Sequence, residues 1–243
     1  MLAVEKRLTS PLLEPASVEK IFEVDSHVGC AISGLTADAR TLVDFGRVEC
    51  QSHRFTYDEP LRVESLTQAL CDLAMSFAEE REEGEEGERK PKMSRPFGVS
   101  LLIAGTDARG PQLLHMDPSG TYIVYDAHAI GSGSEGAITQ LVEKYSKAMT
   151  LEQGKALVTR VLAVRGWERP AAPQLLLAAC PSRSLLPSSP PPPAQDTMEE
   201  KLTTTNFELA TVTAAHGYRL EPAASLQPLI DVAVAAAAAE VGI

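Results

Sequence analysis

The stretch that decides the fold is "IFEVDSHVGCAISGLTADARTLVDF", Ile21 to Phe45, because its hydrophobic period changes halfway along. Up to Ile32 the apolar residues alternate as they do in strands, and Ser33-Gly34 ends that pattern. Beyond Thr36, which we expect to cap a helix running to about Ser52, the spacing becomes helical. The sequence therefore predicts strand structure that passes directly into a helix.

The rest of the chain groups its strands and helices in blocks. The opening "MLAVEKRL" reads as a strand, and the order is strands, two helices, strands, two helices, strand, helix. This order favours an α+β fold with helix pairs laid on sheets over an alternating βα repeat. The other predicted strands are Gly98–Ile103, Gln112–His115, Tyr122–Asp126 and Asn206–Thr213. The other predicted helices are Val63–Glu79, one after Gly131-Ser132-Gly133, Thr150–Ala163 with a Thr150/Gln153 capping box, and Ala223–Val241.

Charge and hydropathy limit the partners. With 22 basic and 33 acidic residues the net charge is −11, which argues against nucleic acid or an acidic membrane as the main partner. Glu5 and Lys6 interrupt the N-terminus before a signal-peptide core can form. No apolar run approaches the roughly 20 residues that a bilayer requires. We expect no membrane association.

The sequence predicts neither a metal site nor a cofactor. Its four cysteines and five histidines show no ligand spacing, and we interpret the cysteines as reduced thiols of a cytosolic or nuclear protein. Gly131-Ser132-Gly133-Ser134 lacks the Lys-Ser/Thr of a phosphate loop. Thr106 and Thr121 would serve as N-terminal nucleophiles only after cleavage, which would discard much of the core. We therefore predict no catalytic residue.

A proline-rich segment interrupts the C-terminal half, with four consecutive prolines from Pro190 to Pro193. Removing Val164–Thr197 places Leu157, Val161, Met198 and Leu202 on one helical stripe. We therefore predict a single domain over residues 1–243, with 164–197 as a disordered insertion whose deletion raises stability, rather than a linker. A polyproline II ligand for an SH3-like partner is the functional alternative. The acidic run Glu79–Lys92 reads as a solvated loop, with docking of a basic partner as its alternative.

Several stretches closely resemble the alpha-type subunits of the 20S proteasome. They run from "AVEKRLTSPLLEPASVEKIFEVDSHVGCAISGLTADAR" through "RPFGVSLLIAGTDARGPQLLHMDPSG" to "MEEKLTTTNFELATVT". The resemblance implies a four-layer αββα sandwich of the N-terminal-nucleophile hydrolase type, with two antiparallel sheets between helix pairs. It also implies a non-catalytic alpha-ring subunit that contributes to assembly, gating and activator docking in ubiquitin-dependent protein degradation.

The resemblance carries over one site. Lys20 of "SVEKI" matches the lysine of the pocket that receives the C-terminal carboxylate of activators, and Gly34 and Leu35 of "SGL" match backbone that lines this pocket. An ammonium is a suitable point-charge partner for a carboxylate. The implied partners are neighbouring alpha subunits, the beta ring, and activators or the regulatory particle, in the cytoplasm and nucleus.

Two departures from the family leave alternatives open. Its N-terminal segment of about 45 residues has no counterpart before Met1, so we expect one sheet to lose a strand pair. The proline-rich insertion falls in a core helix. The competing interpretations are a truncated chain or gene-model product that does not assemble, and an autonomous threonine hydrolase.

Overall fold

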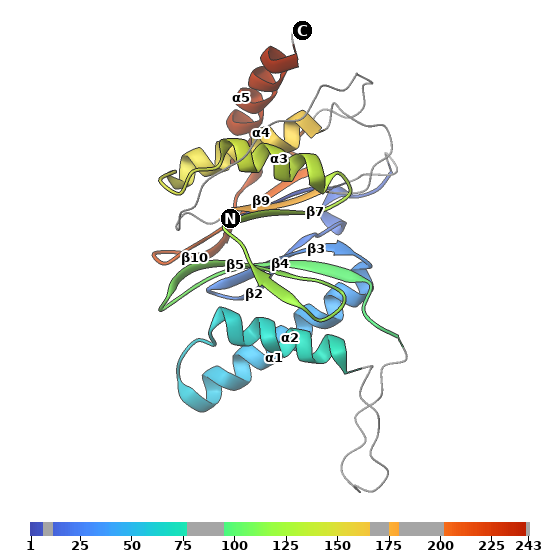
Figure 1. The fold of residues 1–243 in the computed structure, drawn as a ribbon, viewed down its shortest axis with the longest axis vertical. Coiled ribbons are helices and arrows are strands. Elements are labelled where there is room, and N and C mark those ends of the chain that lie inside the picture. Colours follow the sequence, from blue (N-terminus) through green and yellow to red (C-terminus); the bar gives the residue numbers. More distant parts are fainter. Residues whose placement is uncertain (7–11, 77–94, 166–174, 180–201, 242–243) are drawn as a thin grey trace, which may run out of the picture.

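The computed structural model describes residues 1–6, 12–76, 95–165, 175–179 and 202–241. Over these residues the chain forms two antiparallel five-stranded sheets that lie face to face, with helices on both outer sides (Figure 1). The α+β class and the four-layer αββα sandwich are thereby confirmed.

The first sheet has the strand order β10-β9-β1-β8-β7 and therefore places the N-terminal strand at its centre. Helices α3 and α4 lie over its outer face, and α5 packs against α4 and extends away from the sheet (Figure 1). The strands are β1 (Leu2–Glu5), β7 (Ala127–Gly131), β8 (Leu175–Ala179), β9 (Phe207–Thr213) and β10 (Gly217–Leu220). The helices are α3 (Ser134–Lys144), α4 (Leu151–Arg165) and α5 (Ala223–Val241).

The second sheet has the order β2-β3-β4-β5-β6, so each strand pairs with its neighbours in sequence. Helices α1 and α2 cover its outer face (Figure 1). The strands are β2 (Ile21–Asp25), β3 (Val28–Gly34), β4 (Val99–Asp107), β5 (Gly110–Met116) and β6 (Tyr122–Val124). The helices are α1 (Thr36–Tyr57) and α2 (Val63–Met75), and a short 3₁₀ turn, η1 (Pro15–Ser17), precedes β2.

Side-chain alternation along the strands builds three layers of core. Leu2 and Val4 point into the core between the sheets, whereas Ala3 packs under α3, α4 and α5, and all three are fully buried. In β4, Leu102 faces the other sheet while Leu101 and Ile103 face α1 and α2. A strand buried on both faces reads as a continuous apolar run, which explains why "LAV" shows no polar alternation.

Most predicted elements are present, with shifted ends. The Thr150/Gln153 capping box is confirmed, because Thr150 N–H donates to Gln153 Oε1 (2.9 Å) and Gln153 N–H donates to Thr150 Oγ1 (3.3 Å). Thr36 does not cap α1; Leu35 is the N-cap, and the helix continues to Tyr57 rather than Ser52. The sequence did not predict β7 and β10, which are short strands held by their neighbours.

Strand β8 corrects the prediction that residues 164–197 lack regular structure. Leu175–Ala179 falls inside the segment 164–197 that we expected to lack regular structure, and it lies between β1 and β7 in the first sheet. We also expected one of the two sheets to lose a strand pair, yet within the described residues both sheets contain five strands. Helix α4 also extends to Arg165, two residues into that segment. Residues 166–174 and 180–201, like the whole acidic run Glu79–Lys92, lie outside the described residues, so the predictions made for them stay predictions.

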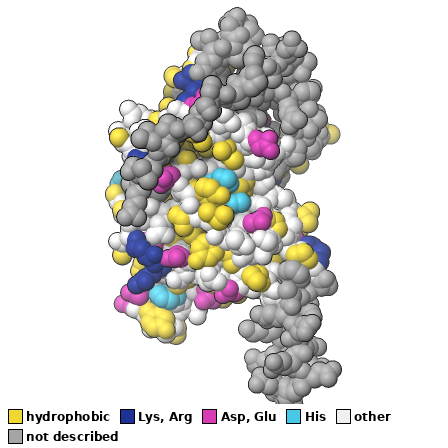
Figure 2. Space-filling model, in the orientation of Figure 1, with side chains coloured by type: hydrophobic (Ala, Val, Ile, Leu, Met, Phe, Trp, Pro, Cys, Tyr) yellow, Lys and Arg dark blue, Asp and Glu magenta, His cyan; other side chains and the backbone are white. Residues whose placement is uncertain are grey.

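A cluster of rings joins the two sheets at one edge. His115 of β5 and His128 of β7 lie with ring centroids 4.9 Å apart, and Tyr125 stacks on His128 at 4.0 Å. Histidine side chains lie among hydrophobic ones near the middle of the face shown in Figure 2. Burial lowers the pKa of His128 to about 4, with the neighbouring His115 adding to the effect, and burial also lowers the pKa of His115. Both rings are therefore neutral near pH 7.

This cluster predicts a pH dependence of stability. Because the pKa of His128 is lower in the folded chain, the unfolded chain binds protons first as the pH falls below about 6.5, and stability is lost from there down to about pH 4. We expect the His128→Phe variant, whose ring stacks but does not titrate, to lose about 1–2 kcal/mol less unfolding free energy than the wild type between pH 7 and pH 5. Urea unfolding at both pH values measures this difference. His216→Phe, at an exposed position, is the control, and equal losses in all three proteins would contradict the assignment.

Candidate functional site

The three residues predicted to form a binding pocket lie at one end of the β2–β3 hairpin. Lys20 immediately precedes β2, and its carbonyl oxygen accepts a hydrogen bond from Ile32 N–H (3.0 Å). Gly34, two residues further along β3, ends that strand, and Leu35 begins α1 as its N-cap. The spacing of about 3.4 Å per residue places Gly34 roughly 7 Å along the strand from the position opposite Lys20. The structure thus brings the predicted residues to the same end of the sheet.

Gly34 allows the chain to turn from β3 into α1 against the neighbouring strand. Its φ of +126° belongs to a region that other residues rarely adopt, and a Cβ atom there would lie 2.3 Å from the Gly98 carbonyl oxygen. That carbonyl accepts a hydrogen bond from Leu35 N–H (2.9 Å). The "SGL" motif is therefore held against the "RPFG" motif by backbone contact.

An ion pair fixes the same junction from the side of the helix. Asp38, in the first turn of α1, accepts hydrogen bonds from Arg95 at 2.7 and 2.8 Å and from Gly98 N–H at 2.9 Å. These hydrogen bonds stabilise the charged carboxylate, and the bonds from Arg95 contribute most. They therefore hold the pKa of Asp38 below its usual value. A carboxylate is also favoured at this position by the positive end of the helix dipole. Asp38 is 8% exposed, so the pair anchors α1 to the segment that leads into β4.

Lys20 is a buried lysine without an ion pair to another described residue. By contrast, Lys6, Lys147 and Lys155 each make one, with Glu208, Asp126 and Glu221 respectively. Lys20 is 4% exposed, and no ion pair or side-chain hydrogen bond joins it to another described residue. Burial lowers its pKa, because the charged form loses hydration without gaining a partner.

This geometry suits an anion at Lys20 and an apolar contact at Leu35. A buried ammonium gains most from a carboxylate that arrives with its own charge. Leu35, at the same end of the hairpin, is 55% exposed. The Leu35 N–H already donates to the Gly98 carbonyl, so it would offer no free donor to a ligand. The assignment of Lys20, Gly34 and Leu35 to a ligand pocket stays a prediction.

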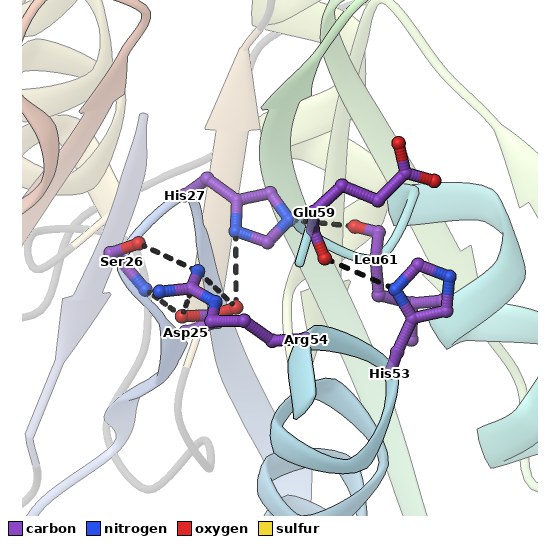
Figure 3. A network of polar contacts seen from close by, with 7 residues as sticks. All are labelled: Asp25, Ser26, His27, His53, Arg54, Glu59 and Leu61. Carbon is purple, nitrogen blue, oxygen red and sulfur yellow. Dashed lines mark hydrogen bonds and ion pairs between the residues drawn. The ribbon is translucent and has the colours of Figure 1, made fainter. Parts of the chain in front are cut away.

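A second polar network closes the opposite end of the hairpin (Figure 3). The buried Asp25 carboxylate accepts two hydrogen bonds from Arg54 of α1, both 3.0 Å long, and one from Ser26 N–H (2.7 Å). His27 donates from Nε2 to the Leu61 carbonyl (2.7 Å), while its Nδ1 lies 3.4 Å from Asp25. The network ties the β2–β3 turn to the end of α1 and to the α1–α2 connection.

The network does not assemble a catalytic triad. Ser26 Oγ lies 3.4 Å from Arg54, and the His27 nitrogens face Leu61 and Asp25, so among the described contacts no base adjoins the serine. Backbone pairing holds the two candidate threonines within the second sheet or its turns. Thr106 N–H donates to the His27 carbonyl (3.1 Å), and the Thr121 carbonyl accepts from Asp117 N–H (2.9 Å).

Sequence reasoning missed the two carboxylate–arginine pairs. Asp38 and Arg95 both lie in the motifs that carry the family resemblance, but 57 residues separate them, and spacing alone does not pair them. Within the described residues, the acidic, histidine and cysteine side chains form no cluster of three that is suited to a metal. None of the described helices combines the length and hydrophobicity that crossing a membrane requires.

Comparison with known proteins agrees with the motifs. A model of the proteasome subunit family matches residues 1–169. The chain is 51% identical over 220 residues to the probable proteasome subunit alpha type-5 of Schizosaccharomyces pombe, covering 90% of this chain and 74% of that protein. It is 49% identical to the alpha type-5 subunit of Dictyostelium discoideum (88% and 74% covered) and 45% identical to that of Trypanosoma brucei brucei (95% and 79%). Type five is also the type that Glu5-Lys6-Arg7, "HMDPSG" and "MEEKL" favour.

The Asp38 junction yields a prediction. Asp38→Asn places an amide donor against Arg95 or Gly98 N–H, so we expect it to lower the free energy of unfolding by about 1–3 kcal/mol at pH 7. Asp44→Asn is the matched control in the same helix, because its carboxylate is 71% exposed and we expect a change within about 0.5 kcal/mol. The difference between wild type and Asp38→Asn should shrink as the pH falls below about 3.9, the ordinary aspartate pKa, because the unfolded chain then binds the proton while folded Asp38, with its lowered pKa, still resists it. Equal effects of the two substitutions in urea unfolding would refute the anchoring role.

Proposed function

We propose a function from one premise: this chain belongs to the proteasome subunit family. It is a non-catalytic subunit of the alpha ring of the 20S proteasome, and it works by assembling with other proteasome subunits. The observation that carries this conclusion is the identity to alpha type-5 subunits along 88–95% of the chain in three relatives. The motifs "SGLTADAR" and "RPFG" supply the Gly34–Gly98 contact and the Asp38–Arg95 pair that build one end of the sandwich.

Exposed apolar side chains support the assembled state. Phe55 and Tyr57, near the end of α1, leave 93% and 66% of their surface exposed, and Val48 on the same helix leaves 68%. Large aromatic groups on a helix surface favour burial against another protein. A neighbouring alpha subunit or the beta ring would cover them.

The chain contributes structure rather than peptide bond cleavage. In N-terminal-nucleophile hydrolases the attacking threonine must be the first residue, so that its amino group activates the hydroxyl. Thr106 and Thr121 each stand within the second sheet or its turns, and cutting the chain before either would separate β2, β3 and α1 from the strands that follow. This supports a subunit without a catalytic threonine.

Activator docking is the finer part of the proposal. Lys20 offers a buried ammonium with no partner among the described residues, and a C-terminal carboxylate would supply the missing charge. Gly34 and Leu35, both exposed, would form the adjoining wall. Entry of such a tail between this subunit and a neighbour would couple activator binding to gating. We place the complex in the cytoplasm and nucleus, with no nucleic-acid or membrane partner.

One experiment tests assembly and docking together. The chain is co-expressed with the remaining subunits of a proteasome core, as wild type and as Lys20→Gln, and the particles are separated by native gel and sedimentation. We expect both forms to enter the same large particle, because the Lys20 side chain has no ion pair or hydrogen bond with another described residue, glutamine retains part of its aliphatic stem, and the backbone bond from Ile32 N–H is kept. We expect the particle with Lys20→Gln to bind a synthetic peptide with an activator's C-terminal sequence about tenfold more weakly, a difference of about 1.4 kcal/mol.

The controls separate the two claims. Lys147→Gln also removes one positive charge, but from the pair with Asp126, and should leave peptide affinity unchanged. An amidated peptide lacks the carboxylate and should not distinguish Lys20→Gln from wild type. A chain found in the unassembled fraction alone contradicts the subunit function, whereas equal affinities in assembled particles contradict the role of Lys20 and leave the subunit function standing.

A further inference from the structure

Strand β8 occupies an interior position in the first sheet. Its backbone pairs antiparallel with β1 at Leu2–Ala178, Ala3–Leu177 and Val4–Leu176. On its other side it pairs with β7 over five positions, from Ala127–Ala179 to Gly131–Leu175. Leu175–Ala179 thus has a hydrogen-bonding neighbour on both edges, as the middle strand of a sheet does.

The neighbours of β8 would be incomplete without it. Leu2, Ala3 and Val4 of β1 are fully buried, and Ala129 and Ile130 of β7 are 1% and 5% exposed. With strands about 4.8 Å apart, β1 and β7 lie roughly 9.6 Å from each other and cannot pair directly. Their facing N–H and C=O groups would then be buried without partners, which is costly. The space between them therefore requires an extended backbone.

The residues beside this space alternate in size. The position of Leu177 lies between two alanines, Ala3 of β1 and Ala129 of β7. The position of Ala178 lies between two larger residues, Leu2 and His128. At these two positions a large residue faces small ones and a small residue faces large ones, whereas Leu176 lies between two large residues, Val4 and Ile130. The segment "LLLAA" also carries no charge and no proline.

We propose that the space between β1 and β7 is a strand-acceptor site, filled in cis by Leu175–Ala179. Its ligand class is an extended, uncharged, proline-free peptide segment that binds antiparallel to both neighbours through its backbone, as in strand addition to a sheet. The proline-rich insertion therefore contributes a strand to the sheet. Deleting Val164–Thr197 removes that strand and lowers stability, which reverses the expectation drawn from the sequence. The inference concerns the isolated chain and does not depend on ring assembly.

A cross-link in the full chain tests the register. Opposite residues of an antiparallel pair have Cα atoms about 4.5–5.5 Å apart, within the range that a disulfide spans. We expect Ala3→Cys with Leu177→Cys, in a Cys180→Ser background, to form an intramolecular disulfide on oxidative refolding, identified by peptide mass mapping. Ala3→Cys with Leu176→Cys is the control, because one residue of slippage puts the two side chains on opposite faces.

Each outcome of the cross-link decides the proposal. A disulfide in the Leu177 variant and none in the Leu176 variant supports β8 in this register. A disulfide between two molecules assigns the strand to a second copy and overturns filling in cis. Equal yields in the two variants, or no disulfide in either, overturn the register and with it the acceptor site.

A complementation experiment tests recognition of the peptide. We expect replacement of Leu175–Ala179 by Gly-Ser-Gly-Ser-Gly to lower the melting temperature by at least about 4 °C. The peptide Lys-Lys-Leu-Leu-Leu-Ala-Ala-Lys-Lys should restore the loss in a saturable manner, and the same peptide with proline at its third leucine should not. An unchanged melting temperature after the replacement, or equal effects of the two peptides, would overturn the proposal. If the chain with the replaced segment does not fold, the disulfide experiment in the full chain still tests whether β8 pairs with β1.

Discussion

The pairing of β1 along both of its edges is the constraint on which the rest of the structure depends. Its first residues are buried between the facing sheet and the layer of α3, α4 and α5, so the strand has no solvent-facing side. A buried backbone must find all of its hydrogen bonds within the protein. Strand β9 satisfies one edge and β8 the other, and through them β10 and β7 join the sheet. The helices on that side then have a complete surface to cover.

The second sheet carries the β2–β3 hairpin with the predicted pocket residues Lys20, Gly34 and Leu35. Its strands follow one another in sequence, so the β3–α1 transition meets the start of β4 directly, where Gly34 lies against Gly98 and Asp38 pairs with Arg95. This junction leaves Leu35 exposed, and Lys20, which immediately precedes β2, pairs with Ile32 two residues before the end of β3. At the other end of the hairpin, Asp25 and Arg54 secure the end of α1. A rigid hairpin clamped at both ends is a suitable frame for a site that must recognise a partner.

Local sequence predicted the elements whose pattern lies entirely within a few neighbouring residues. The change of period at Thr36, the Thr150/Gln153 capping box and the apolar run of β1 depend on neighbours in the chain, and the structure contains all three. Features set by distant residues were missed. Helix α1 runs five residues beyond Ser52 because His53 and Arg54 in its last turns bond to Glu59 and Asp25, and β8 exists because β1 and β7 need a partner. For the site, the family resemblance pointed to Lys20, Gly34 and Leu35, whose pocket role stays a prediction, but it gave neither the burial of Lys20 nor the Asp38–Arg95 ion pair.

Amide hydrogen exchange on the full chain tests the central claim, that β8 is an integral strand of the first sheet, most directly. If β1 is paired on both edges, peptides that contain Leu2–Glu5 and Leu175–Ala179 should be protected to a similar degree, because the two strands share their hydrogen bonds and open together. Both should open with a free energy close to that of global unfolding. Exchange of Leu175–Ala179 within seconds, with Leu2–Glu5 still protected, would contradict the account.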